Sequence, residues 1–253
     1  MTEIQKNVIK LINDGKDVMG CSKTGSGKTI AFLLPIVNKL LQNAVPETPF
    51  SNETSFPVAL ILAPTRELAE QIYAESRKIC HKTNIIVSRV YGGVPFPPQL
   101  RDIRNGVDIV VATPGRFNDL TKNNHFDLSH TTNLIIDEAD RMLDMGFEPQ
   151  IDQIINGYNM PRTKERQNLF FSATFAKEVR DLAKDFMNDY YMVSVNNTNE
   201  TLVNENIKHK LIRADRGGEN NTLLELLKEL EGSILSIYYL IKYFVKQSVQ
   251  LII

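Results

Sequence analysis

Short apolar segments rich in β-branched residues alternate along the chain with longer segments in which apolar residues recur every three or four positions. The short segments begin at residues 17 (DVMG), 58 (VALIL), 85 (IIVSRV), 107 (VDIVV), 134 (LII), 168 (NLFF) and 190 (YYMVSV). Continuous apolar runs are typical of strands buried on both faces of a parallel sheet. The longer segments include ELAEQIYAESRKI and FAKEVRDLAKDF, whose apolar residues have helical spacing. The alternation predicts an α/β fold, a mostly parallel sheet with helices on both faces.

Charge and cysteine content narrow the classes of function. The 253 residues include 29 Lys and Arg and 30 Asp and Glu, a formal net charge of −1. A protein that binds nucleic acid through its overall charge is strongly basic, so any such contact here must be local. The two cysteines, Cys21 and Cys80, lack CxxC spacing, which fits a reducing compartment. With no secretory signal in MTEIQKNVIK, we expect a cytoplasmic or nuclear protein.

Two segments are predicted to be loops. Residues 43–57 (NAVPETPFSNETSFP) contain three prolines and little periodicity, which indicates a surface loop inside a domain. Residues 160–167 (MPRTKERQ) are basic and offer a possible RNA contact, but a solvated loop before the next strand is the preferred interpretation.

A glycine-containing loop follows the first predicted strand and leads into a helical pattern. SKTGSGKT occupies residues 22–29, and IAFLLPIVNKLL follows it. Gly25 and Gly27 permit a backbone that turns several N–H groups inward, and the next helix adds its N-terminal donors. We expect Lys28 to reach the β- and γ-phosphates of a nucleotide and the Thr29 hydroxyl to hold Mg²⁺. The alternative is an ordinary turn that contains Gly-Lys-Thr, since Ser22 stands where the strict pattern has glycine. The predicted nucleotide-binding residues of this loop are Thr24, Gly25, Ser26, Gly27, Lys28 and Thr29.

A pair of carboxylates follows another predicted strand. NLIIDEAD places Asp137 and Glu138 at the end of a buried segment. With Lys28 they form the predicted catalytic set: Asp137 holds Mg²⁺, and Glu138 orients or deprotonates the attacking water. The alternative is that an Asp after a strand caps the next helix, which explains one carboxylate but not its pairing with the glycine loop.

Turn-forming or polar residues follow six of the predicted strands at once. They are residues 23–29, 64–67, 91–93, 113–116, 137–140 and 172–174. In a parallel sheet these strand ends lie at one edge, where ligands bind. Arg66 and Arg116, with the hydroxyl groups and backbone donors beside them, suit contacts to a phosphate backbone. For either arginine alone, ordinary surface charge is the alternative.

Six short motifs together resemble a known family. SKTGSGKT, PTRELA, GG, TPGR, DEAD and SAT occur in the order and at the approximate spacings seen in the DEAD-box RNA helicases, over residues 2–174. Residues 141–151 (RMLDMGFEPQI) look like the Vasa-like branch. The resemblance implies a RecA-like P-loop NTPase domain that uses ATP and Mg²⁺. It also implies binding of RNA, single-stranded or in short duplexes, without regard to sequence, by a monomer with ribonucleoprotein partners and no membrane attachment.

The resemblance also implies roles for individual residues. Gln5 matches the family's adenine-reading glutamine and Thr2 the threonine of the same motif, although a surface glutamine is the alternative from the residues alone. Asp140, Ser172 and Thr174 match residues that couple the nucleotide site to the RNA site; packing of small residues is the alternative for the last two. The residues expected to face single-stranded RNA are Pro64, Thr65, Arg66, Gly93, Thr113, Gly115 and Arg116.

The carboxyl-terminal part departs from the family pattern. We expect a RecA-like ATP-binding domain over 1–200 and the start of a second RecA-like domain over 201–253, truncated or divergent after about residue 233. Residues 205–235 predict one strand and one helix, and no arginine occurs beyond residue 216, so the second-domain arginine finger is missing. Residues 233–253 are long enough for a membrane span but contain two lysines and two glutamines at 242–250, so no anchor is expected.

Three functions remain open from the sequence. The first is an ATP-dependent RNA helicase, in which RNA-stimulated ATP hydrolysis drives local duplex unwinding or remodelling of RNA–protein complexes. The second is a non-catalytic fragment that binds RNA or a partner, and the third is another P-loop ATPase. For this chain alone we expect weak ATP binding, poor hydrolysis and no unwinding.

Overall fold

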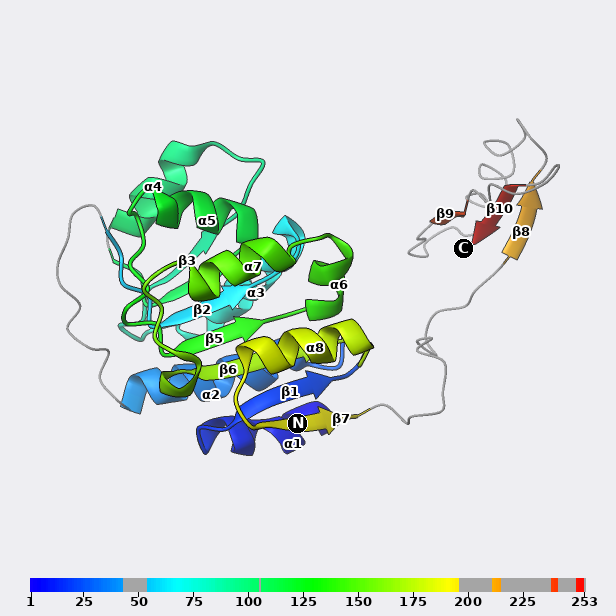
Figure 1. The fold of residues 1–253 in the computed structure, drawn as a ribbon, viewed down its shortest axis with the longest axis horizontal. Helices are drawn as coiled ribbons and strands as arrows, with labels where there is room; N and C mark the ends of the chain where they lie inside the picture. The colour runs from blue at the N-terminus through cyan, green and yellow to red at the C-terminus, as the bar shows by residue number, and fades with distance from the viewer. Residues whose placement is uncertain (43–53, 105, 196–210, 215–237, 241–248, 253) are drawn as a thin grey trace. The chain divides into compact units, whose positions relative to one another are not determined.

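The computed structural model describes residues 1–42, 54–104, 106–195, 211–214, 238–240 and 249–252 (Figure 1). The chain divides into two compact units, Met1–Asn199 and Glu200–Ile253. Most of the predicted loop at 43–57 lies outside the described residues, as does most of 205–235. Within the described part of the chain, no helix is both long and apolar enough to cross a bilayer.

Seven strands of the first unit form a single sheet. They are β1 (Asp17–Cys21), β2 (Ala59–Leu62), β3 (Val87–Val90), β4 (Ile109–Ala112), β5 (Asn133–Ile136), β6 (Gln167–Ser172) and β7 (Tyr190–Ser194). Their order in the sheet is β3-β4-β2-β5-β6-β1-β7, and every pairing between them is parallel. Each of the seven apolar segments forms one of these strands, so the predicted α/β fold with a parallel sheet is confirmed.

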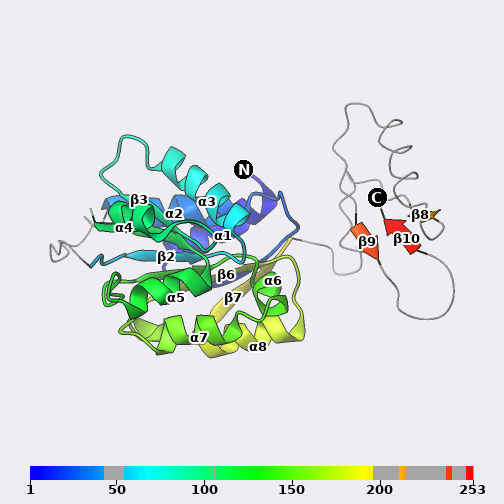
Figure 2. The same cartoon turned by 90° about the horizontal axis from the view of Figure 1, so that it is seen from above.

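Helices cover both faces of this sheet, as the view from above shows (Figure 2). Successive strand residues point to opposite faces. Leu60 and Leu62 of β2 therefore join the core under α5–α8, whereas Ala59 and Ile61 join the core under α1–α3. All four are fully buried, which is why the strand reads as a continuous apolar run. The helices are α1 (Glu3–Asn13), α2 (Lys28–Gln42), α3 (Arg66–Ile79), α4 (Phe96–Arg104), α5 (Pro114–Lys122), α6 (Ala139–Asp144), α7 (Glu148–Asn156) and α8 (Lys177–Phe186), with a 3-10 turn η1 (Thr163–Glu165).

The basic segment 160–167 is not simply a solvated loop, because its arginine at 166 is buried. The Arg166 guanidinium donates from Nε to Asn168 Oδ1 at 2.7 Å and from a terminal nitrogen to the Pro161 carbonyl. Burial lowers the pKa of Arg166. This residue supports the loop before β6 from inside and offers no charge to a nucleic acid.

Three further strands are described in the second unit. They are β8 (Leu211–Ala214), β9 (Tyr238–Leu240) and β10 (Val249–Ile252), and their order is β8-β10-β9. Both pairings of β10 are antiparallel. One of these strands, β8, falls in the segment expected to contain a strand and a helix; the residues expected to be helical lie outside the described part.

Candidate functional site

The strand order sorts the six polar segments into two neighbouring halves of one edge. All follow the carboxyl ends of parallel strands, so they share that edge. Gly92-Gly93, Thr113–Arg116 and Pro64–Glu67 follow β3, β4 and β2, which are adjacent. The segments that follow the next three strands, β5, β6 and β1, are 137–140, 172–174 and 22–29. In the sequence the three predicted RNA segments stand between 22–29 and the segments 137–140 and 172–174. In the sheet the latter three segments follow neighbouring strands, and the RNA segments follow the other three.

The loop after β1 is folded back on itself. Gly25 and Gly27 have φ angles of +79° and +92°, in the left-handed region that strains other residues. The hydroxyl groups of Ser22 and Ser26 are hydrogen-bonded at 2.7 Å. The Lys28 side chain is only 8% exposed, and its ammonium donates to the Ser22 carbonyl and, at 3.4 Å, to that of Lys23. Lys28 therefore points into the loop, where an anion can replace these carbonyls as its acceptor.

The remaining residues of this loop surround Lys28. Thr24 and Gly25 are exposed, whereas Ser26, Gly27 and Thr29 are half-buried. Lys28 and Thr29 form the first turn of α2, so the N-terminal donors of that helix face the same place. The strand before and the helix after are those that the phosphate-loop interpretation requires, and an isolated turn would have neither.

Gln5 and Thr2 lie against the loop from the start of α1. The Thr2 backbone N–H donates to Gln5 Oε1 at 2.9 Å, and Gln5 Nε2 donates to the Gly27 carbonyl at 3.2 Å. A Cβ atom on Gly27 would lie 2.5 Å from Gln5 Nε2, so only glycine admits this contact. Gln5 is thus fixed beside the loop, unlike a free surface glutamine. Its amide keeps one N–H and one acceptor lone pair for a ligand.

Asp137 is a buried carboxylate beside the loop. It is 2% exposed, and its Oδ1 accepts a hydrogen bond from the Glu138 backbone at 3.0 Å. Burial raises the pKa of Asp137 to about 6, although the positive charge of Lys28 opposes the shift. The Lys28 ammonium and the Asp137 carboxyl therefore interact electrostatically. A buried carboxyl of raised pKa is ready to take a cation, which would restore its charged form.

Glu138 lies at the N-terminus of α6 in an unusual backbone conformation. It is the N-cap residue, with φ of +52° and no side-chain capping bond, and its carboxylate pairs with Arg141 at 3.3 Å. Asp137 is therefore not the helix cap that the alternative interpretation requires. Non-glycine residues in the left-handed region are uncommon and cluster at functional sites.

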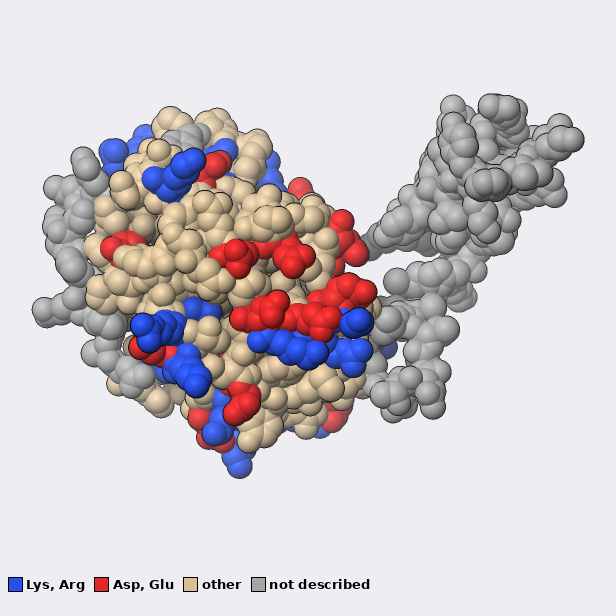
Figure 3. Space-filling view, in the orientation of Figure 1, with Lys and Arg blue, Asp and Glu red and all other residues tan. Residues whose placement is uncertain are grey.

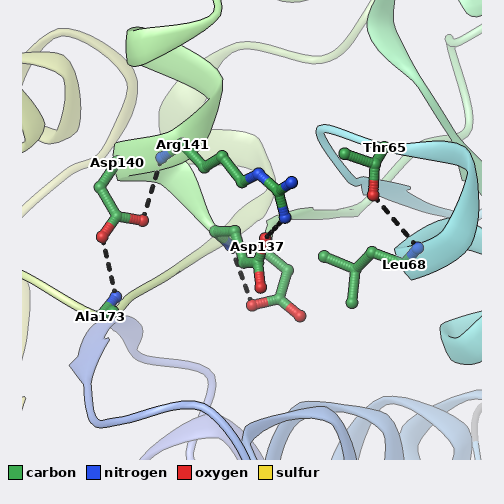
Figure 4. Close-up of polar contacts among 7 residues, drawn as sticks. Thr65, Leu68, Asp137, Asp140, Arg141 and Ala173 are labelled. Carbon is green, nitrogen blue, oxygen red and sulfur yellow. Dashed lines mark hydrogen bonds and ion pairs between the residues drawn. The ribbon is translucent and has the colours of Figure 1, made fainter. Parts of the chain in front are cut away.

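Asp140 joins the segment after β5 to the segment after β6. Its Oδ2 accepts from the Ala173 backbone at 3.2 Å and from the Thr174 hydroxyl at 3.3 Å. Ser172 Oγ in turn accepts from the Thr174 backbone at 3.2 Å. Figure 4 shows Asp140 turned toward Ala173, with Asp137 between this contact and Thr65. The three predicted coupling residues form one hydrogen-bonded group, and this goes beyond packing of small residues.

Cys21 lies directly below this group, at the end of β1. Its thiol donates to the Ala173 carbonyl at 3.2 Å, and burial raises the pKa of Cys21 to about 11. The thiol is therefore a neutral hydrogen-bond donor here and not a nucleophile.

In the other half of the edge, Thr65 and Thr113 are N-caps. The Thr65 hydroxyl accepts from the Leu68 backbone at 3.3 Å and starts α3 (Figure 4), and Thr113 precedes Pro114 at the start of α5. Pro64 is buried and Thr113 half-buried, so both residues are less accessible to a ligand than residues of an exposed loop. Two helix N-termini consequently point at the same edge, which suits an anionic ligand.

The glycines and arginines of this half differ in exposure. Gly93 is exposed, with φ of +77°. Gly115 borders open space, because a Cβ atom added to it would have no other atom within 4 Å. Arg66 is exposed. Arg116 is half-buried and donates to the Val94 carbonyl at 3.3 Å, which ties the segment after β4 to the one after β3. Arg116 thus has a structural contact, and its contact with RNA stays a prediction.

Three residues of this half were not predicted from the sequence. The Arg66 guanidinium lies 5.1 Å from the centre of the Tyr91 ring, the Tyr91 hydroxyl donates to Glu70, and Glu70 pairs with Arg89 at 3.1 Å. These contacts join residues 20 or so positions apart and have no local sequence signal, apart from the position of Tyr91 directly before the two glycines.

Comparison with protein-family models identifies the family to which the first unit belongs. The DEAD/DEAH box helicase model matches residues 2–182, which include all six polar segments and α1. The chain belongs to the DEAD/DEAH box helicase family. Two solved structures are similar to it. A hypothetical ATP-dependent RNA helicase from Sulfolobus tokodaii is 38% identical with a TM-score of 0.65, over 76% of this chain and 52% of that one. The yeast DEAD-box splicing factor Prp28 is 33% identical with a TM-score of 0.72, over 79% and 46%.

Family membership gives the buried site its context. This DEAD-box domain spans about half the length of the two solved structures. Membership implies ATP binding and RNA binding, and the first unit is a RecA-like domain. The donors present fit a triphosphate: they are a lysine ammonium and the N–H groups at the N-terminus of a helix. Beside them lies Gly27, where a Cβ atom would clash with Gln5.

Proposed function

We propose that this chain is the ATP-binding part of an ATP-dependent RNA helicase, in which hydrolysis of ATP is coupled to binding of RNA. The observation that carries the proposal is the sorting of the strand ends: the glycine loop and the carboxylates occupy one half of the edge, and Arg66 with two helix N-termini occupies the adjacent half. The Asp140 contacts lie within the nucleotide half, so a change in the bound phosphates would alter them before it altered the RNA half.

Each residue of the nucleotide half has a proposed task. Lys28 exchanges its two carbonyl acceptors for phosphate oxygens, and the Thr29 hydroxyl and Asp137 hold Mg²⁺. Mg²⁺ held by these residues would neutralise the negative charge of the phosphates. Glu138 orients or deprotonates the attacking water, which requires its carboxylate to leave the exposed Arg141. Gln5 uses its remaining N–H and lone pair to read adenine.

The RNA half is proposed to hold a single strand through its phosphates and 2′-hydroxyl groups. Arg66, Arg116 and the N-termini of α3 and α5 supply positive charge and N–H donors without reading bases. Other surfaces are less suited. Over α8, acidic and basic side chains lie in adjacent rows (Figure 3), and the sequence of that helix, KEVRDLAKDF, contains both kinds. That mixed surface offers no basic stripe to a phosphate backbone.

The names of the similar structures agree with this proposal, since one is described as an RNA helicase and the other as a splicing factor. We also assign the chain to the Vasa-like branch, on the match of residues 141–151, which form most of α6 and the start of α7.

The proposal is tested by ATP turnover with Mg²⁺ in the presence of single-stranded RNA, of single-stranded DNA, and of neither. We expect RNA, but not DNA, to stimulate ATP turnover, and we expect turnover to be lost in Lys28→Ala and Glu138→Gln. Stimulation by DNA as well as RNA would favour another P-loop ATPase. ATP and RNA binding without any turnover would identify a non-catalytic binding module.

A further inference from the structure

Arg66 is held in place by an aromatic ring. Its guanidinium carbon lies 5.1 Å from the centre of the Tyr91 ring, within the range of a cation–π contact. Among the residues that the structure describes, no carboxylate lies within ion-pair distance of Arg66. A carboxylate partner would occupy the N–H groups of the guanidinium, whereas a ring face leaves all five donors available. Arg66 is therefore oriented and still able to bind a phosphate.

The ring itself is fixed from three directions. Tyr91 is 5% exposed, and its backbone N–H and carbonyl are both bound by the side chain of Gln99, at 3.0 and 3.2 Å. Its hydroxyl donates to Glu70, one turn along α3 from Arg66. Rotation about the Cα–Cβ bond would carry the hydroxyl away from Glu70, so this contact holds the ring in place beside Arg66.

Glu70 is fixed in turn by residues farther from the edge. Its second carboxylate oxygen pairs with Arg89 at 3.1 Å, and the Arg89 guanidinium lies 4.4 Å from the centre of the Tyr73 ring. The series Arg66, Tyr91, Glu70, Arg89 and Tyr73 alternates between α3 and the β3 segment. Such a series holds the start of α3 against the strand that leads to Gly92 and Gly93.

We propose that Tyr91 is a positioning residue for RNA binding, which acts by presenting Arg66 to a phosphate with its donors free. The inference rests on the proposed function, because it needs RNA at this edge. Tyr91 touches no RNA itself; it lowers the conformational freedom that the long Arg66 side chain would lose on binding.

The test measures binding of a short fluorescein-labelled oligouridylate to the 253-residue chain by fluorescence anisotropy, over a series of salt concentrations. Tyr91→Leu removes the ring and should weaken binding by about two- to fivefold, the range of an exposed cation–π contact. Tyr91→Phe keeps the ring and loses only the hydroxyl contact with Glu70, so it should weaken binding less than Tyr91→Leu does. The dependence on salt should be the same in both, because no cation is removed, whereas Arg66→Ala should lower the salt slope by about 0.7.

The double variant decides whether Tyr91 acts through Arg66. In an Arg66→Ala background, Tyr91→Leu should have no further effect on RNA affinity. A further loss there, or unchanged affinity when Tyr91→Leu is made alone, overturns the inference while the RNA site stands. If Arg66→Ala itself leaves RNA binding unchanged, the proposed RNA site is what fails.

Because Tyr91 is buried, Tyr91→Leu is first checked by circular dichroism. If it does not fold, the parent chain carries the test by NMR. Stacking on Tyr91 should shift the Arg66 side-chain protons upfield through the ring current, and shifts typical of a freely rotating arginine would overturn the inference.

Discussion

Replacement of Asp137 by Asn should change how the stability of the first unit depends on pH. The folded protein holds this carboxyl at a pKa of about 6, against 3.8 for an ordinary Asp, because burial disfavours the charge. The folded state therefore takes up the proton before the unfolded state does as pH falls. It follows that this group makes the protein more stable toward acid pH, and less stable above pH 6 or so, where the buried charge remains.

The size of the effect follows from the two pKa values. Between about pH 8 and about pH 5, a pKa of about 6 folded and 3.8 unfolded adds about 1.4 kcal/mol to the free energy of unfolding through this single group. Asp137→Asn removes that increment. Its amide carries its own desolvation cost, but that cost is the same at every pH and drops out of the comparison.

The assay is urea unfolding followed by far-UV circular dichroism, for the parent chain and Asp137→Asn across this range. The difference between the two free energies should shift by about 1.4 kcal/mol in favour of the parent as pH falls. Asp144→Asn, at the exposed end of α6, controls for the change of charge. Parallel curves for the parent and Asp137→Asn would show that the carboxyl is not held in a desolvated place, and would remove the reason for expecting it to attract a cation.

Three other outcomes are expected. Lys28→Ala should weaken binding of a fluorescent ATP analogue roughly tenfold or more, since it removes a charged hydrogen-bond donor to phosphate. Gly27→Ala and Gly25→Ala should both lose about 1–2 kcal/mol of stability through left-handed backbone strain, but only Gly27→Ala should displace Gln5 and reduce the preference for ATP over GTP in competition binding. Thr174→Val removes a 3.3 Å hydrogen bond to Asp140. It should lower the RNA-stimulated rate of hydrolysis and leave ATP affinity unchanged in the same titration.

The strands were predictable because their signal is local. Each strand of the large sheet coincides with one of the apolar segments, although β3 (Val87–Val90) includes Ser88 and Arg89. β2 (Ala59–Leu62) is completely buried on both faces. The site segments could be placed at one edge for the same reason, since the parallel direction alone brings the carboxyl ends together.

Several helices were less visible in the sequence because they have proline in their first turn. α4, α5 and α7 have prolines in their first turns, at 97 and 98, 114 and 149, where a search for periodicity meets a helix breaker. In the first turn the missing N–H has no intrahelical partner to lose, so proline starts these helices instead of ending them.

Some side-chain contacts between distant segments could not be predicted. Arg166 looks like one more charge in a basic loop, yet it is buried against Asn168. Tyr91 looks like the end of a strand, yet its ring lies against Arg66, the first residue of α3. Both depend on which strands are neighbours, and strand order is not encoded in any single segment.

The two halves of the edge are joined by a line of hydrogen bonds just past the strand ends. The Ser22 N–H donates to the Ser172 carbonyl at 3.2 Å, and the Asp137 N–H donates to the Leu62 carbonyl at 3.0 Å. Ala63 and Thr113 continue the line from β2 to β4 and from β4 to β3, each at 2.9 Å, by backbone donation to Ala112 and Val90.

Between β6 and β5 the corresponding connection is made by the Asp140 side chain, which binds the Ala173 N–H at 3.2 Å. A side-chain carboxylate can rotate away or change partners, whereas strand-to-strand backbone bonds break only if the sheet does. If loss of a phosphate changes the structure of the RNA half, the hydrogen bond between Asp140 and Ala173 is therefore the one in this line that can break without unfolding of the sheet. This is the physical reason for expecting Thr174→Val to affect coupling and not nucleotide affinity.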